Sequence, residues 1–395
     1  MDELSARMHD TRPVDRYGSH AVLSHDAISI ARVICILGVI YVHAWTGLGG
    51  HDLELARGTA QENLRWFLME TFGRSAVPLL GLISGWLVAG SSRTRSWTAH
   101  IERKARTILV PMIAWNLIAL VLVCGTAWLF TLPAPTPPSV GWVVEEIFIL
   151  TRNPDVNVQM PFLRDLFVCM AMAPLLVRMN GRSLGLVIAL AAAGQVFGLG
   201  APVILRPAIL VFFGLGIVAR RAGLAERAAT WPLGLAIAPF AVLLPVQLWL
   251  AAAPDMPRTG ILIASFDLAM RVTASLFFWR LAWALSKSPA RTLLLKIEPF
   301  AFLIFCGHLI FMWLAGPLLG QVFGKLGAPA YPVYLLLQPL MVLACTIAIG
   351  RFLQRYAPGL AGILSGGRLK TRKPAAATPL PAVASPEPAS PAHTG

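Results

Sequence analysis

Residues 28–48 read ISIARVICILGVIYVHAWTGL, an apolar run interrupted by one arginine and one histidine. A helix needs roughly 20 such residues to cross the hydrocarbon core of a bilayer, so this run predicts a membrane span. Comparable runs follow near residues 70–90, 107–130, 161–178, 183–200, 203–219, 232–252, 261–285, 298–319 and 332–353. The sequence therefore predicts an all-α fold, a polytopic transmembrane bundle of about ten helices.

The composition of the 395 residues also indicates a membrane protein. Of these residues 56% are hydrophobic and 13% are charged, whereas a soluble protein has about 25% charged residues. The net charge is +14, but the basic residues cluster in short gaps between apolar runs, so they indicate orientation in a lipid bilayer and not a nucleic-acid partner. The five cysteines lie within apolar runs and show no metal or redox spacing, so we expect no metal site.

The basic residues predict the topology. With the N-terminus in the cytoplasm, most Lys and Arg residues fall in gaps that face the cytoplasm, as the positive-inside rule requires, and an even number of spans returns the C-terminus to that side. We therefore expect a multi-pass protein of the inner (plasma) membrane. Residues 1–27 form a polar cytoplasmic segment in this interpretation, 28–354 the transmembrane domain, and 366–395 a disordered Pro/Ala-rich cytoplasmic tail.

Ionisable residues stand inside several predicted spans, where each charge costs on the order of 2.5–3.5 kcal/mol. On the first span, Arg32 and His43 are eleven residues apart, which is about three helical turns and roughly 16 Å, so they share one face. The orientation places Arg32 near the cytoplasm and His43 near the outer side. The other such residues are Arg74, Arg164, Asp165, Asp267, Arg271, Arg280, Glu298 and His308. Together they predict an outer polar layer with a histidine and an inner layer rich in arginine, although packing histidines, a local Arg164–Asp165 pair and basic orientation anchors are the structural alternatives.

Several segments in this order resemble the membrane-bound acyltransferase-3 family, bacterial proteins that O-acylate glycans. Arg32 and His43 match its Arg-x10-His motif on the first helix, and residues 77–86, VPLLGLISGW, resemble its VPLFFxxSGY segment. Residues 103–106, RKAR, resemble its cytoplasmic Arg-x-x-Arg segment. Residues 161–166, PFLRDL, resemble its WFLRDL segment, and residues 305–308, FCGH, are weakly similar to a late helix with a histidine.

The sequence also departs from the family pattern. Pro161 stands where the family usually has Trp, and Leu80 and Gly81 replace aromatic residues. These differences concern contacts with the acceptor and leave the expected fold unchanged. The chain has no segment resembling the extracytoplasmic hydrolase-like domain of some relatives, so we expect the stand-alone type.

The resemblance implies an O-acyltransferase that moves an acetyl or succinyl group from cytoplasmic acyl-CoA, as co-substrate, to a hydroxyl of a cell-surface or exported glycan, free or lipid-linked. No permanently bound cofactor is implied. His43 is then the general base, or less favourably an acyl carrier, with Asp165 or Asp267 orienting its imidazole. Arg74 or Arg164 would stabilise the tetrahedral oxyanion. Arg32, Arg103 and Arg106 would bind the phosphates of coenzyme A. His308 is a further substrate-binding candidate.

A multi-spanning transporter of a polar or anionic solute is the main alternative function, because polar groups at mid-depth also line transport paths. No inverted repeat of the kind common in transporters is evident, which disfavours it. A scaffold or sensor is disfavoured by the number of ionisable groups within the spans. The acyl group, the acceptor hydroxyl and the oligomeric state stay open from the sequence.

Overall fold

The structure is a computed structural model, and it describes residues 14–369 apart from 75, 95, 133, 201, 202 and 254–259. These described residues form helices and connecting turns, with no strand among them. The first half contains α1 (Val14–Val42), α2 (Gly50–Leu55), α3 (Ala60–Leu68), α4 (Ala76–Ala89), α5 (Trp97–Lys104), α6 (Val110–Ala119), α7 (Gly125–Phe130), α8 (Val140–Phe148) and α9 (Pro161–Leu176). The second half contains α10 (Gly181–Phe197), α11 (Pro207–Arg221), α12 (Leu224–Thr230), α13 (Leu233–Ala252), α14 (Ile261–Leu285), α15 (Ala290–Ile297), α16 (Ala301–Phe323), α17 (Tyr331–Tyr356) and α18 (Pro358–Leu364).

A helix occupies each of the ten predicted spans, which confirms a polytopic helical membrane bundle. Seven helical runs in the described residues are long and apolar enough to cross a bilayer, and α11 with α12 makes an eighth if this pair, bent by 81°, is one span. The remaining two predicted spans correspond to α9 and α10, which have 16 and 17 residues. The number of about ten spans therefore stays a prediction.

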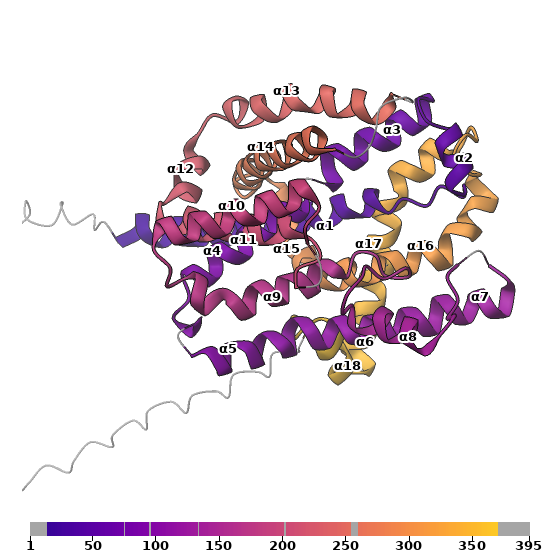
Figure 1. Cartoon of the computed structure of the whole chain (residues 1–395), viewed down its shortest axis with the longest axis horizontal. Coiled ribbons are helices and arrows are strands. Elements are labelled where there is room, and N and C mark those ends of the chain that lie inside the picture. The colour runs from indigo at the N-terminus through magenta and orange to yellow at the C-terminus, as the bar shows by residue number, and fades with distance from the viewer. Residues whose placement is uncertain are drawn as a thin grey trace, which may run out of the picture.

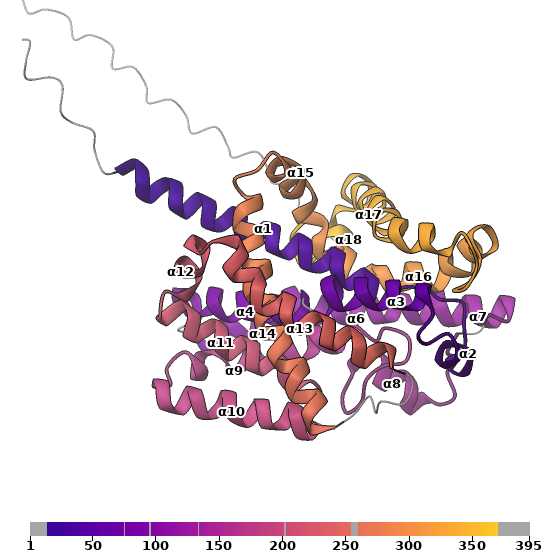
Figure 2. The same ribbon diagram turned by 90° about the horizontal axis from the view of Figure 1, so that it is seen from above.

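The arrangement of the connecting helices agrees with the predicted alternation of sides. Both views place α2, α7 and α8 toward one end of the bundle and α12 toward the other, where Figure 1 also shows α5 (Figures 1 and 2). The sequence placed α2 and α8 in outer connections, α7 at the outer end of the third predicted span, and α5 and α12 in cytoplasmic connections. The structure thus brings together the segments that were predicted to lie on the same side of the membrane. Which end of the bundle faces the cytoplasm stays a prediction.

Helix α1 lies in the interior and contacts α4, α14, α16 and α17. Ile30 and Ile40 on α1 have no exposed surface, which is typical of a central helix whose apolar faces are all covered. Because α1 also carries Arg32 and His43, its packing fixes two candidate site residues relative to the rest of the bundle.

Glycines allow α4 and α11 to pack closely. A Cβ atom at Gly85 would lie 1.9 Å from the carbonyl oxygen of Phe213, and one at Gly216 would lie 2.0 Å from that of Leu82. Small residues at such crossings let helix backbones approach in a membrane, where packing stabilises helix association. Gly85 belongs to the VPLLGLISGW segment, so this part of the motif has a structural explanation.

Wider π-type turns interrupt two of the spans near the candidate site residues. One covers Met69–Gly73, directly before Arg74, and another covers Ala105–Leu109, between α5 and α6. Such i→i+5 turns change the face on which the following side chains lie, and they occur frequently at functional sites.

The predicted tail begins within the described residues. Residues 366–369 follow α18 and lie beside Thr107, because a Cβ atom at Gly366 would be 2.4 Å from the Thr107 carbonyl oxygen. The rest of the predicted tail, 370–395, and residues 1–13 of the predicted N-terminal segment lie outside the described residues. Residues 14–27, in the second half of that N-terminal segment, belong to α1.

Candidate active site

Two cavities lie along α1 and share part of their walls. The first, which we call the basic cavity, has a volume of about 650 Å³, and its charged lining residues are Arg32, Arg93, Arg103, Lys104, Glu298 and Arg368. The second, which we call the histidine cavity, has a volume of about 470 Å³, and its polar lining residues are His43, Arg74, Gln159, Gln195, Arg206 and Arg271. Phe162 and Phe305 line both cavities, and their ring centroids are 5.5 Å apart in an edge-to-face arrangement. This aromatic pair therefore stands between the two cavities.

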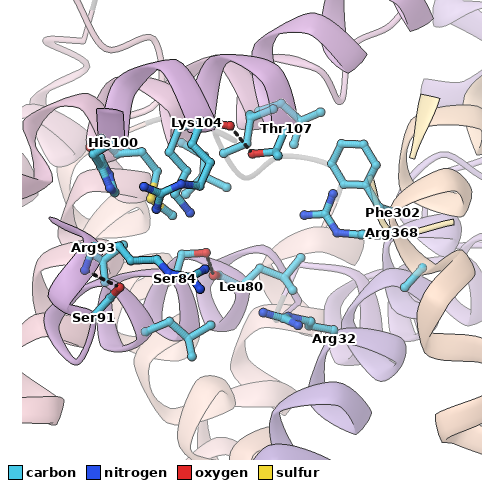
Figure 3. Close-up of a pocket in the computed structure, with 18 of the residues that line it drawn as sticks. Arg32, Leu80, Ser84, Ser91, Arg93, His100, Lys104, Thr107, Phe302 and Arg368 are labelled. Atoms are coloured by element: carbon cyan, nitrogen blue, oxygen red, sulfur yellow. Dashed lines mark hydrogen bonds between the residues drawn. The ribbon is translucent and has the colours of Figure 1, made fainter. Parts of the chain in front are cut away.

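The basic cavity contains far more positive than negative charge. Figure 3 shows Arg32, Arg93, Lys104 and Arg368 around the cavity, contributed by four separate stretches of the chain. Arg32 Nη1 lies 3.3 Å from Glu298 Oε1. Within the described part of the chain, none of the other four cations in this cavity forms an ion pair with a carboxylate. Such a concentration of cationic donors is suited to a ligand with several negative charges.

Two histidines approach each other beside the histidine cavity. The ring centroids of His43 and His308 are 5.3 Å apart, and His43 lines the cavity, whereas His308 is 1% exposed. His308 Nδ1 lies 2.8 Å from the carbonyl oxygen of Phe305, so Nδ1 carries the proton and Nε2 is left as an acceptor. This Nε2 atom is buried and has no hydrogen-bond partner among the described residues.

The arginines of the histidine cavity, in contrast, already have partners. Arg74 Nε lies 3.2 Å from Glu70 Oε1, and Arg271 Nε lies 2.8 Å from Asp267 Oδ2. Arg206 donates a hydrogen bond of 2.8 Å to the carbonyl oxygen of Val158. These guanidinium groups are held in place, and the two carboxylates neutralise much of their charge.

Asp165 is completely buried, but it does not serve the role that the sequence suggested. Its carboxylate accepts hydrogen bonds from the backbone N–H groups of Leu205 (3.2 Å) and Arg206 (2.7 Å) and from the Arg164 side chain (2.7 Å). Asp165 thus fixes the loop that leads into α11 and positions Arg206. Among the described residues, neither Asp165 nor Asp267 is hydrogen-bonded to His43, whereas the His308 ring lies beside it.

Arg164 supports the same loop and does not line the histidine cavity. It donates to the carbonyl oxygens of Val203 (2.6 Å) and Leu150 (3.1 Å) in addition to its contact with Asp165. Of the two arginines that the resemblance offered for the oxyanion, Arg74 is therefore the one that lies at the cavity. Arg164 and Asp165 form a structural pair, one of the alternatives that the sequence left open.

The structure separates Arg103 from Arg106. Arg103 lines the basic cavity, whereas Arg106 does not line it, is 74% exposed and lies 2.5 Å from Glu102. Both residues border a second depression of the surface. Residues three apart share a face in a regular α-helix, but the π-type turn that begins at Ala105 rotates Arg106 away from that face. The motif therefore supplies one cavity arginine, together with Lys104 beside it.

Sequence reasoning missed several lining residues. Lys104, Arg93 and Arg368 appeared only as basic residues of cytoplasmic connections and the tail, and Arg206 appeared as a loop residue. The i,i+4 spacing of Asp267 and Arg271 on one helix was a signal that could have identified them as an ion pair. The described residues contain no group of three His, Cys, Asp or Glu side chains placed to hold a metal ion.

Comparison with known proteins identifies the family of the chain. The family described as "Acyltransferase domain" (acyltransferase-3) matches residues 25–350. The chain is 28% identical over 377 residues to the succinoglycan biosynthesis protein ExoH of Rhizobium meliloti (strain 1021), covering 89% of this chain and 95% of that protein. No solved structure matches. Because the family match extends over most of the chain and includes both histidines and all but one of the cations of the basic cavity, this membrane protein belongs to the acyltransferase-3 family and is an acyltransferase.

Proposed function

We propose that this acyltransferase binds acyl-CoA in the basic cavity and transfers the acyl group to a hydroxyl of a polysaccharide in the histidine cavity. The observation that carries the proposal is the difference in charge between two cavities that share Phe162 and Phe305. In the basic cavity, four of the five cations have no carboxylate partner among the described residues. The histidine cavity presents histidine and amide groups, and two of its three arginines are paired with carboxylates.

The donor is assigned to the basic cavity because coenzyme A carries several phosphate charges. Arginine binds phosphate through two parallel N–H···O bonds, and a charge-assisted hydrogen bond is about twice as strong as a neutral one. Arg93, Arg103 and Lys104 lie in the connection that the positive-inside rule places in the cytoplasm, where acyl-CoA is made. The acyl group is acetyl or succinyl in this proposal, and the enzyme lies in the inner membrane.

The acceptor is assigned to the histidine cavity because a sugar hydroxyl is neutral and needs hydrogen-bonding partners more than charge. Gln159 and Gln195 supply amide groups there. The printed name of the relative, a succinoglycan biosynthesis protein, favours a polysaccharide acceptor, free or on a lipid carrier.

The chemistry follows from the two histidines. His43 takes the proton of the sugar hydroxyl as its oxygen attacks the thioester carbonyl. The resulting tetrahedral oxyanion lies near Arg74, Arg206 or Arg271 and is stabilised by them. When the carbon–sulfur bond breaks, His43 returns the proton to the departing sulfur, so ester and free coenzyme A are the products. His308 acts as a positioning residue, because its free Nε2 can accept the N–H of His43 and leave the other His43 nitrogen unprotonated.

The thioester end reaches His43 between Phe162 and Phe305. This path suits a short acyl end that carries no phosphate, whereas the phosphates stay with the cations of the basic cavity. Arg32 and His43 are separated by roughly 16 Å along α1. The flexible arm of coenzyme A spans this distance, so the phosphates can stay in the basic cavity while the thioester reaches His43.

The test uses the purified full-length protein in lipid nanodiscs with labelled acetyl-CoA or succinyl-CoA and a lipid-linked or polymeric glycan. We expect label to appear in the glycan, with equimolar release of free coenzyme A, and His43→Ala to abolish both. Transfer that is unchanged in His43→Ala would overturn the assignment of the base. Movement of a solute across vesicles without thioester consumption would favour the transporter.

A further inference from the structure

The chain after the last long helix turns back toward the basic cavity. Helix α18 packs against α6, and Trp115 Nε1 donates a hydrogen bond of 3.0 Å to the carbonyl oxygen of Leu364. Gly366 and Gly367 then adopt positive φ angles of +59° and +84°, a conformation that glycine adopts without steric cost. Leu369 is 1% exposed, and its carbonyl oxygen accepts from Gln354 Nε2 at 3.2 Å. This docked segment comprises residues 357–369.

The turn directs Arg368 into the basic cavity. The guanidinium carbon lies 4.1 Å from the ring centroid of Phe302, and Nη1 donates a hydrogen bond of 3.0 Å to the carbonyl oxygen of Ser365. Figure 3 shows the side chain pointing from Phe302 into the space between Lys104 and Arg32. Arg368 therefore has a defined position, and most of its five N–H donors remain available to a ligand.

Among the described residues Arg368 has no carboxylate in ion-pair contact, although Glu298 acts on it from farther away. Its strongest charged neighbour is another cation, Arg32. Desolvation and that neighbour lower the pKa of Arg368 to about 10, so the guanidinium is still protonated at pH 7. Placing a cation beside other cations is unfavourable unless an anion binds among them.

We propose that Arg368 binds a phosphate group of the acyl-CoA donor and that the docked segment 357–369 is a wall of the donor site. This inference rests on the proposed function. Arg368 lies beyond residues 25–350, which match the family, so no motif of that domain points to it. The cation–π contact with Phe302 and the tight turn at Gly366 hold the guanidinium ready to bind, which lowers the entropy that binding has to overcome.

The experiment measures acyl-CoA affinity of the purified full-length protein and of Arg368→Ala, Arg368→Lys and Arg355→Ala. Arg355 is the matched control, because it is an exposed arginine on the adjoining helix α17 and lies outside both cavities. Each variant is also assayed for transfer from acyl-pantetheine, a donor that lacks the nucleotide phosphates. Loss of a hydrogen bond to a charged group costs about 1.5–3 kcal/mol, so Arg368→Ala should weaken acyl-CoA binding roughly 10- to 150-fold.

We expect acyl-pantetheine transfer to be unchanged in Arg368→Ala, partial recovery of acyl-CoA affinity in Arg368→Lys, and wild-type behaviour in Arg355→Ala. Unchanged acyl-CoA affinity in Arg368→Ala would overturn the inference. Equal losses with acyl-CoA and acyl-pantetheine would also overturn it, because they indicate a structural role for the side chain. If the wild-type protein itself fails to bind acyl-CoA, the proposed function fails, and that outcome is distinct from a failure confined to Arg368.

Discussion

The pairing of His43 with His308 gives a quantitative prediction about catalysis. The rings are 5.3 Å apart, and His308 Nε2 is a buried acceptor without a partner among the described residues. We consider His43→Ala, His308→Leu and the double variant. Removing a general base costs about 10²–10⁴-fold in rate. Replacing His308 removes the acceptor that orients His43, and an unsatisfied donor costs about 1–3 kcal/mol, which corresponds to a loss of roughly 5- to 150-fold.

The two losses should not multiply. If His308 acts only through His43, the double variant should be as slow as His43→Ala alone, because residues that act as a unit show non-additive effects. Turnover is followed as release of free coenzyme A in the presence of glycan, with acyl-CoA affinity measured in parallel. That affinity should stay at the wild-type value, since the donor phosphates lie roughly 16 Å from His43 along α1.

Two results would refute this account. A double variant whose loss equals the product of the single losses would mean that the histidines act independently. A fall in acyl-CoA affinity in His43→Ala would mean that the residue supports the donor site or the fold. Circular dichroism and thermal unfolding of His43→Ala distinguish these two roles, because only a variant with a damaged fold changes its spectrum or its melting temperature.

Three further predictions follow from the packing and the cavities. Arg103→Ala should weaken acyl-CoA binding roughly 10- to 150-fold, whereas Arg106→Ala should change it less than about fivefold because its ion pair is exposed; equal effects would contradict the separation of these two residues. Gly85→Ala should lower the free energy of unfolding by about 1–3 kcal/mol, whereas Gly185→Ala, with nothing within 4 Å of its added Cβ, should not lower it; thermal melts in detergent provide the comparison. Phe162→Leu should raise the ratio of butyryl to acetyl transfer, and an unchanged ratio would count against a path between the aromatic rings.

The helices and the relation of Arg32 to His43 were predictable because both depend on local geometry. Apolar runs of sufficient length form helices in a bilayer, where every backbone polar group must be satisfied within the segment. The rise of 1.5 Å per residue then fixes the separation of two positions on one helix. Arg32 and His43 accordingly line different cavities on α1.

The rest of the site depends on features that are not local in the sequence. Asp165 was offered as a partner of His43, but its hydrogen-bond partners include the backbone N–H groups of Leu205 and Arg206, about forty residues further along the chain. Arg106 was grouped with Arg103 because both match the Arg-x-x-Arg segment of the family, and a π-type turn that begins at Ala105 lies between the two residues. Arg368 was counted among the basic residues of the tail, because the residues around it in the sequence do not indicate that the chain folds back toward the basic cavity.

Under the proposed function, charge pairing explains how the enzyme keeps its donor and its acceptor in separate cavities. Arg74 and Arg271 have Glu70 and Asp267 as partners, so a phosphate that entered the histidine cavity would have to compete with a carboxylate for each guanidinium. In the basic cavity, Glu298 is the carboxylate among the lining residues, and it lies beside Arg32. A polyanionic donor therefore gains much more electrostatic free energy in the basic cavity. The acyl end carries no phosphate and only has to pass between Phe162 and Phe305, so the charge pattern directs the thioester toward His43 while holding the nucleotide behind it.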